Sequence, residues 1–231
     1  MTLDEAKTLV AGVPHWHHKF EIFPGLVTQG TYPPDVLLAR AKLPPDLTGM
    51  RVLDIGTSDG FFALQMAKRG ASVTAIDYRR KQDHGFGVME QLNLVQIDYH
   101  QMNVYELETK QLGEFDIVLF LGVLYHLPDM IRALHMIRGI CRGTLYVETH
   151  CENDFSKKVA AARYYKGDTL AKDRTNFWAP NRLCVLDMLH DTGFDVARDE
   201  AWGSRLVVKA EAAAVSGAWR EKMDLGYGLA R

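Results

Sequence analysis

Short apolar runs alternate with helix-like segments through the middle of the chain. Runs at Val52–Ile55, Ala71–Ile76, Leu94–Ile97, Phe115–Leu121 and Thr144–Glu148 predict five strands. The run "FDIVLFL" is apolar on both faces, which is typical of a central strand in a parallel sheet. Because these strands alternate with helical segments, the pattern predicts an α/β fold with a mostly parallel sheet.

The segments between the runs carry helix signals. Phe61–Arg69 places apolar residues at mostly helical spacing and stops at Gly70, a residue that commonly follows a helix. Lys81–Asn93 also has helical character, although two glycines interrupt it. Two further helices are predicted, at Asp129–Arg138 and Asn181–His190.

Near the end of the chain, Phe194–Trp202 and Leu206–Lys209 are two strands joined by a short turn that contains "GS". This spacing predicts a hairpin that adds an antiparallel edge to the sheet. We expect one domain over residues 1–231. Its parts are an N-terminal cover (1–50), a core (51–150), an insertion near the active site (151–180) and a C-terminal helix with hairpin (181–210).

Composition and charge narrow the functional classes. The chain has 231 residues, 47% of them hydrophobic, which suffices for one sizeable core. A net charge of −2 without a Lys/Arg run disfavours nucleic-acid binding. No segment approaches the roughly 20 apolar residues of a membrane span. Three cysteines without CxxC spacing argue against a disulfide framework or a structural zinc site and fit a reducing, cytoplasmic setting.

The loop after the first strand reads Gly56-Thr57-Ser58-Asp59-Gly60 and does not follow the dinucleotide pattern G-x-G-x-x-G. Asp59 stands near a helix N-terminus, where a carboxylate opposes the pyrophosphate of NAD. S-adenosylmethionine (SAM) has no phosphate and carries two cationic groups. Asp54, at the end of the strand, could hold its ammonium group. The alternative is an ordinary tight turn without a ligand.

Two later segments support a SAM site. Asp77 ends the second strand, where its carboxylate can accept hydrogen bonds from both ribose hydroxyls. Asn103 and Val104 follow the third strand and could present an amide to the adenine edge and an apolar wall to its face. Together these features favour SAM as cofactor and S-adenosylhomocysteine (SAH) as product.

Three blocks, "FDIVLFLGVLYHLPDMIRAL", "GTLYVETH" and "RTNFWAP", together with the entry "PHWHHKF", resemble one group of proteins. It is the class I methyltransferase family that contains the tRNA wobble-uridine carboxymethyltransferases. The resemblance implies a Rossmann-like sheet of seven strands with SAM or a derivative at the carboxyl ends of the strands. The expected cofactor-binding residues are Trp16, Asp54, Gly56, Thr57, Ser58, Asp77, Tyr78, Asn103, Val104 and Leu121.

The chain also departs from that family. Only about fifteen residues precede Trp16, whereas the tRNA enzymes carry a long basic N-terminal region. Their lysine for the extra carboxylate of carboxy-SAM corresponds to His18 here, with Lys19 one residue out of register. We therefore expect ordinary SAM and a small-molecule acceptor rather than carboxy-SAM and tRNA.

The candidate catalytic residues are His126, Tyr125, His150 and Arg174. His126 follows the fourth predicted strand, where a base could remove a proton from the acceptor; the alternative is a structural histidine in the turn. The resemblance places Arg174 at the acceptor pocket, and a guanidinium there suits an anionic acceptor. Trp16 is either a lid over the cofactor or a core residue. No metal is expected, because the "HWHH" histidines cannot converge on one ion from a regular helix.

The leading hypothesis is a SAM-dependent methyltransferase that modifies an N or O atom of a small molecule. A tRNA-modifying enzyme, as in the resembling family, is the second hypothesis. A non-catalytic SAM-binding protein is the third, and a NAD-dependent oxidoreductase is disfavoured by the Asp59 loop.

Overall fold

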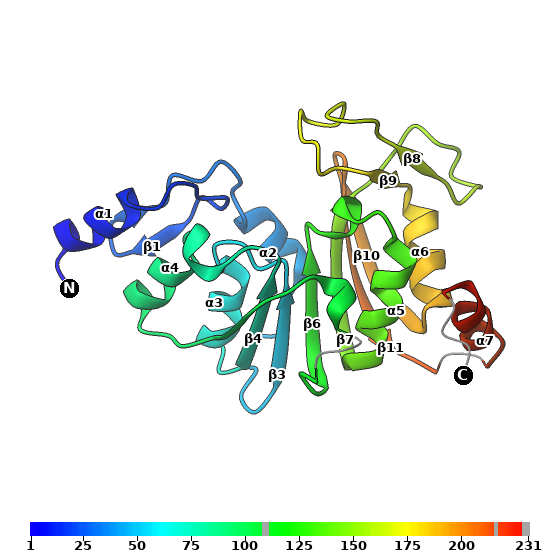
Figure 1. The fold of residues 1–231 in the computed structure, drawn as a ribbon, viewed down its shortest axis with the longest axis horizontal. Coiled ribbons are helices and arrows are strands. Elements are labelled where there is room, and N and C mark those ends of the chain that lie inside the picture. Colours follow the sequence, from blue (N-terminus) through cyan, green and yellow to red (C-terminus); the bar gives the residue numbers. More distant parts are fainter. Residues whose placement is uncertain (108–110, 215–216, 228–231) are drawn as a thin grey trace. The chain divides into compact units, whose positions relative to one another are not determined.

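The computed structural model describes residues 1–107, 111–214 and 217–227 (Figure 1). Within these residues the main sheet has seven strands in the order β10-β11-β7-β6-β3-β4-β5. The strands are β3 (Arg51–Ile55), β4 (Ser72–Asp77), β5 (Asp98–Gln101), β6 (Phe115–Leu121), β7 (Cys141–His150), β10 (Phe194–Trp202) and β11 (Arg205–Ala212). β3, β4 and β5 pair in parallel, whereas β11 is antiparallel to both β7 and β10. The α/β sheet and its antiparallel C-terminal hairpin are confirmed.

The chain divides into two compact units, one of Met1–Glu106 with Phe115–Leu119 and one of Leu107–Glu114 with Phe120–Arg231. The single domain over residues 1–231 stays a prediction. The first unit holds α1 (Leu3–Ala11), β1 (Glu21–Phe23), β2 (Leu26–Val27), α2 (Asp35–Ala41), α3 (Phe61–Lys68), η1 (Lys81–Asp83), α4 (Phe86–Asn93) and η2 (Val104–Glu106). The second holds η3 (Leu124–His126), α5 (Met130–Ile140), β8 (Ala162–Tyr164), β9 (Trp178–Pro180), α6 (Arg182–Asp191) and α7 (Gly217–Gly226).

The third predicted strand is the one that the pattern misplaced. Leu94–Ile97 was the predicted range, but β5 is Asp98–Gln101. Leu94 instead ends α4 in a left-handed conformation with φ of 54°, and it is 92% exposed. The backbone N–H of Ile97 donates to Oε1 of Glu90 in α4 at 2.8 Å. This bond ties residues 94–97 to the end of the helix instead of to a neighbouring strand. The predicted strand at Leu94–Ile97 is therefore wrong, because these apolar residues follow directly on the end of α4.

The 151–180 segment is held to the turn after β6 within the second unit. β8 and β9 pair antiparallel, beyond the carboxyl end of β7 (Figure 1). The backbone N–H of Phe177 donates to the carbonyl oxygen of Tyr125 at 3.0 Å. The indole N–H of Trp178 donates to the carbonyl oxygen of Pro128 at 3.2 Å. These bonds hold Phe177 and Trp178 beside η3 and the residues that follow it.

Candidate active site

The glycine loop joins β3 to α3 in the first unit. Gly56, Ser58 and Gly60 all have positive φ angles, of 72°, 52° and 82°. The backbone N–H of Gly56 donates to the carbonyl oxygen of Ile76 at 2.8 Å, which ties the loop to the neighbouring strand β4. Glycine adopts a positive φ with little steric strain because it has no Cβ, which explains why Gly56 suits this position. The loop thereby turns sharply at the carboxyl ends of two adjacent parallel strands.

Asp77 ends β4 and is buried beside this loop. Its carboxylate accepts the backbone N–H of Ser58 at 2.9 Å and that of Arg79 at 3.0 Å. It also accepts the Nε of Arg79 at 3.2 Å, and the same guanidinium reaches the Ser58 hydroxyl at 3.1 Å. Arg79 is not among the site residues that the sequence predicts. Its position two residues after the acid was the available signal.

Asp54 lies one strand away and is also buried. The Thr57 hydroxyl donates to its Oδ2 at 2.6 Å. Burial raises the pKa of Asp54 to about 6, because loss of water outweighs the hydrogen bond from Thr57. A cationic ligand that reached this carboxylate would favour its ionised form.

Asp59 has a different role from the one expected. It is fully buried, and its Oδ2 accepts the backbone N–H groups of His17 at 2.9 Å and His18 at 2.7 Å. Its other oxygen bonds the ring of His18. Burial alone would raise its pKa, but the bonds and charge of His18 outweigh that effect and lower the pKa. Asp59 therefore anchors the entry segment at His17 and His18.

The remaining predicted cofactor residues of the first unit differ in burial. Trp16 is buried, and its indole N–H donates to the carbonyl oxygen of Val10 at 3.1 Å. A Cβ at Gly85 would come within 2.1 Å of the Trp16 ring, so ring and backbone are closely packed. This position matches the core alternative rather than a lid. Three others are Val104, which is buried, and Tyr78 and Asn103, which are exposed.

In the second unit, the turn after β6 and the end of β7 bring three predicted residues together. The ring centroids of Tyr125 and His126 lie 4.1 Å apart, and those of Tyr125 and His150 lie 6.2 Å apart. Leu121, also predicted, is buried at the end of β6. Arg174 is exposed and forms no ion pair with any residue that the structure describes.

An ion pair that the sequence does not predict supports this cluster. Arg205, at the start of β11, forms two hydrogen bonds with the buried carboxylate of Glu148, one of them 2.6 Å long. Its guanidinium also lies over the Tyr125 ring, 4.9 Å from the centroid. Burial raises the pKa of Tyr125 despite the Arg205 charge, so its phenol is neutral and can donate a hydrogen bond. A buried strand-end acid such as Glu148 was a signal that a cation had to be near.

His126 is half-buried and faces the 151–180 segment. Its Nδ1 lies 3.1 Å from the carbonyl oxygen and 2.9 Å from the hydroxyl of Thr175. Burial lowers the pKa of His126, and burial is also the main cause of the lowered pKa of His150. Both imidazoles are therefore neutral near pH 7, the form that can accept a proton.

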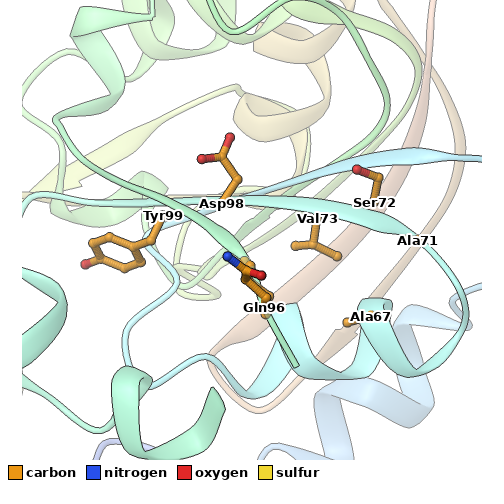
Figure 2. Close-up of a pocket in the computed structure, with 8 residues that line it drawn as sticks. Ala67, Ala71, Ser72, Val73, Gln96, Asp98 and Tyr99 are labelled. Atoms are coloured by element: carbon orange, nitrogen blue, oxygen red, sulfur yellow. The ribbon is translucent and has the colours of Figure 1, made fainter. Parts of the chain in front are cut away.

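A pocket of about 420 Å³ lies where β4 and β5 begin, at the opposite end of these strands from the glycine loop (Figure 2). It is lined by Ala67, Ala71, Ser72, Val73, Gln96, Ile97, Asp98 and Tyr99, and contains none of the predicted site residues. In the described part of the chain, no group of histidine, cysteine or acidic side chains is arranged to hold a metal ion. None of the helices described there is long and apolar enough to cross a bilayer.

Several curated proteins that resemble the chain are named as O-methyltransferases. The "Ubiquinone biosynthesis O-methyltransferase" of Xanthomonas campestris pv. campestris (strain B100) is 34% identical over 134 residues, covering 56% of this chain and 54% of that protein. The protein of the same name from Pseudomonas aeruginosa (strain LESB58) is 37% identical over 94 residues, covering 39% and 40%. The chain thus spans about half the length of these relatives or less.

Solved structures share the fold at low sequence identity. The N-terminal domain of EvdMO1, crystallised in the presence of SAH and D-fucose, has a TM-score of 0.70 at 19% identity, covering 93% of this chain and 97% of that one. The magnesium protoporphyrin IX methyltransferase of Synechocystis PCC 6803, with bound SAM, has a TM-score of 0.58 at 19% identity, covering 78% and 77%. The Rossmann-like methyltransferase fold is therefore confirmed.

The family comparison covers most of the chain. The family model described as "Methyltransferase domain" matches residues 30–198, which include the glycine loop, Asp77 and the β6 turn. The chain therefore belongs to the methyltransferase domain family and carries a class I SAM-dependent methyltransferase domain.

Proposed function

We propose that the protein transfers a methyl group from SAM to an N or O atom of a small-molecule acceptor and releases SAH. The observation that carries the proposal is the pair of buried carboxylates, Asp54 and Asp77, on either side of the Gly56 turn. A cation and a diol are suitable partners for such groups, and SAM supplies both without a phosphate. The printed names of the curated relatives favour an oxygen acceptor.

The cofactor roles follow from the chemistry of each residue. Asp54 would hold the ammonium of the methionine part, with Thr57 orienting its carboxylate. Asp77 would accept the ribose hydroxyls, and Val104 would form part of an apolar adenine wall. Ordinary SAM is preferred over carboxy-SAM in this proposal, because the His18 ring is already bonded to Asp59.

Methyl transfer is an in-line displacement in which the acceptor attacks the methyl carbon and the sulfur leaves with the bonding electron pair. An oxygen or nitrogen acceptor loses a proton, so a neutral base assists. His126 is our candidate base, with His150 as the second. Tyr125, neutral and held by Arg205, would donate a hydrogen bond that orients the acceptor.

Arg174 supports an acceptor with an anionic group. Its guanidinium is exposed and without an ionic partner in the described parts of the chain, and such a group binds carboxylates in bidentate fashion. The three free cysteines fit the reducing, cytoplasmic setting that we propose for this reaction.

The resemblance to the tRNA wobble-uridine carboxymethyltransferases supplies the second candidate function. The "GVLYH" and "RTNFWAP" blocks carry that resemblance, and both lie around the His126 cluster. A SAM-binding protein without catalysis is the third candidate.

Two measurements test these functions in order. Calorimetry with SAM, SAH, carboxy-SAM and NAD should show binding of SAM and SAH, with weaker carboxy-SAM and no NAD. SAH release is then measured with a panel of small phenols and aromatic carboxylic acids, and separately with bulk tRNA. NAD binding without SAM binding would overturn the cofactor assignment. Turnover with tRNA alone would establish the second candidate, and SAM binding without any turnover the third.

A further inference from the structure

The hydrogen bonds around His126 determine which ring nitrogen carries the proton. Nδ1 lies 3.1 Å from the carbonyl oxygen of Thr175, and a carbonyl can only accept. The Thr175 hydroxyl is also bonded to Nδ1, at 2.9 Å. That hydroxyl donates its own proton to Oδ1 of Asp173 at 2.7 Å, so it too presents a lone pair to the ring. Nδ1 must therefore be the protonated nitrogen.

Thr175 is held firmly enough to impose this arrangement. Its backbone N–H donates to the same Asp173 oxygen at 2.8 Å. Two residues further on, the backbone N–H of Phe177 donates to the carbonyl oxygen of Tyr125, which immediately precedes His126. The ring and its acceptor are thus tied together through the main chain, and the bond from His126 does not depend on a mobile side chain alone.

We infer that Thr175 and Asp173 are positioning residues that keep His126 in the Nδ1-protonated tautomer, so that Nε2 is the nitrogen that accepts the acceptor's proton. The use of that base in methyl transfer rests on the proposed function. The tautomer and its cause do not.

The proposed step is balanced without another reactant. The acceptor's O–H or N–H bond breaks and its proton moves to Nε2 of His126. The acceptor's electron pair forms the bond to the methyl carbon, and the C–S electron pair passes to sulfur, which becomes neutral in SAH. The resulting imidazolium keeps its Nδ1 proton, and this N–H continues to donate a hydrogen bond to Thr175, whose hydroxyl in turn donates to the Asp173 carboxylate.

The charges that face His126 act in opposite directions. Asp173 and the Thr175 carbonyl favour the imidazolium, whereas burial and the charge of Arg205 oppose it. The Tyr125 ring, which contacts the imidazole, is neutral at pH 7. Burial raises the pKa of Asp173, but the two bonds from Thr175 outweigh it, so Asp173 is ionised near neutral pH. The Thr175 hydroxyl is a second acceptor for the Nδ1 proton. Removing that hydroxyl or the Asp173 charge should therefore lower the pKa of His126, although the Thr175 carbonyl remains in both variants.

The test is an NMR titration of the full chain labelled with ¹⁵N-histidine, in which His126→Gln identifies the His126 signals among nine histidines. The ¹⁵N shifts of the wild-type ring should report the Nδ1-protonated tautomer. In Thr175→Val and Asp173→Asn the pKa of His126 should fall by roughly 0.5–1 unit. Thr175→Ser keeps the hydroxyl and should retain the wild-type value. Thr169→Val is the matched control, because among the described residues the Thr169 hydroxyl bonds only the nearby carbonyl of Lys166.

An Nε2-protonated ring in the wild type would overturn the inference, as would a pKa of His126 that is unchanged in both Thr175→Val and Asp173→Asn. Two-dimensional amide spectra that match the wild type away from residues 173–178 would show that the variants keep the native fold. Because the titration needs neither SAM nor an acceptor, its failure leaves the proposed function standing. Likewise, absence of SAM binding in calorimetry would overturn the function and leave the positioning of His126 intact.

Discussion

The guanidinium of Arg79 holds the carboxylate of Asp77, with Nε 3.2 Å from Oδ1 and a terminal nitrogen 3.4 Å from Oδ2. The backbone N–H of Ser58 also donates to Oδ2, and that of Arg79 donates to Oδ1. Each oxygen therefore accepts two hydrogen bonds within the protein. A carboxylate offers about four lone-pair positions. The ribose hydroxyls of a bound cofactor would therefore compete with the Arg79 side chain, which is 28% exposed and can move into solvent.

Arg79→Ala should strengthen SAH binding by roughly two- to fivefold, because a partly exposed ion pair contributes about 1 kcal/mol or less. Calorimetry at low and high salt measures this change, and the difference from wild type should shrink as salt weakens the ion pair. Arg80→Ala is the control, since Arg80 pairs with the surface residue Asp83. Weaker binding by Arg79→Ala would mean that Arg79 supports the loop instead of competing with the ligand.

Asp77→Ala should weaken SAH binding by roughly 1–3 kcal/mol, the cost of leaving ribose hydroxyls without an acceptor. The same titration measures it, with Asp83→Ala as an acidic control on the following 3₁₀ turn. Unchanged affinity would remove Asp77 from the ribose site.

SAH affinity should rise as pH increases from 5 to 7. Asp54 has a pKa of about 6, and only its ionised form attracts an ammonium group. Affinity should increase up to about tenfold per unit below that pKa and level off above it. Calorimetry across this range measures the profile, and Asp54→Asn should bind weakly at every pH without the rise.

The same carboxyl affects stability with the opposite sign. Its folded pKa of about 6 lies above the unfolded value of about 3.9, so the folded state binds more protons between these limits. Stability should therefore fall as pH rises from about 4 to 6, by up to about 3 kcal/mol from this group. Urea unfolding at several pH values should show a flatter profile for Asp54→Asn. An equally steep profile in that variant would show that Asp54 is not the cause.

Asp59→Ala should destabilise the first unit by roughly 2–5 kcal/mol, because two buried backbone N–H groups and the His18 ring lose their acceptor. Because the pKa of Asp59 is lowered in the folded state, its contribution to stability also depends on pH. That contribution is complete above the unfolded pKa of about 3.9 and is lost as pH falls through the folded pKa. Urea unfolding gives both quantities. Asp46→Ala should cost far less, because Asp46 is exposed and accepts hydrogen bonds from the neighbouring Thr48.

Glu148→Gln or Arg205→Met alone should cost roughly 3–5 kcal/mol, because each leaves an uncompensated charge in a largely buried pair. The double variant should recover part of that loss, since neither charge remains. A double-mutant cycle by denaturant unfolding measures the coupling, and strictly additive losses would contradict it. The pair Arg182–Asp199, which is more exposed than Arg205–Glu148, provides the matched comparison.

Local patterns along the sequence determined the strands and helices of the core. β6 and β10 have the predicted bounds, because a continuous apolar run and a hairpin signal are both local. The carboxylates Asp54 and Asp77 were also predictable, since each terminates a recognisable strand. β5 was misplaced because the same apolar letters can end a helix or begin a strand, and only the packing of α4 distinguishes them.

Tertiary structure decided which polar groups pair. Asp59 reads as a ligand-facing acid in sequence, but the entry segment, some 41 residues earlier, supplies its partners. Arg205 reaches Glu148 only because β11 lies beside β7, and Thr175 reaches His126 from 49 residues away. A side chain's neighbours in sequence are given by the chain, whereas its hydrogen-bond partners depend on which distant backbone is packed against it, and burial then makes those pairings obligatory.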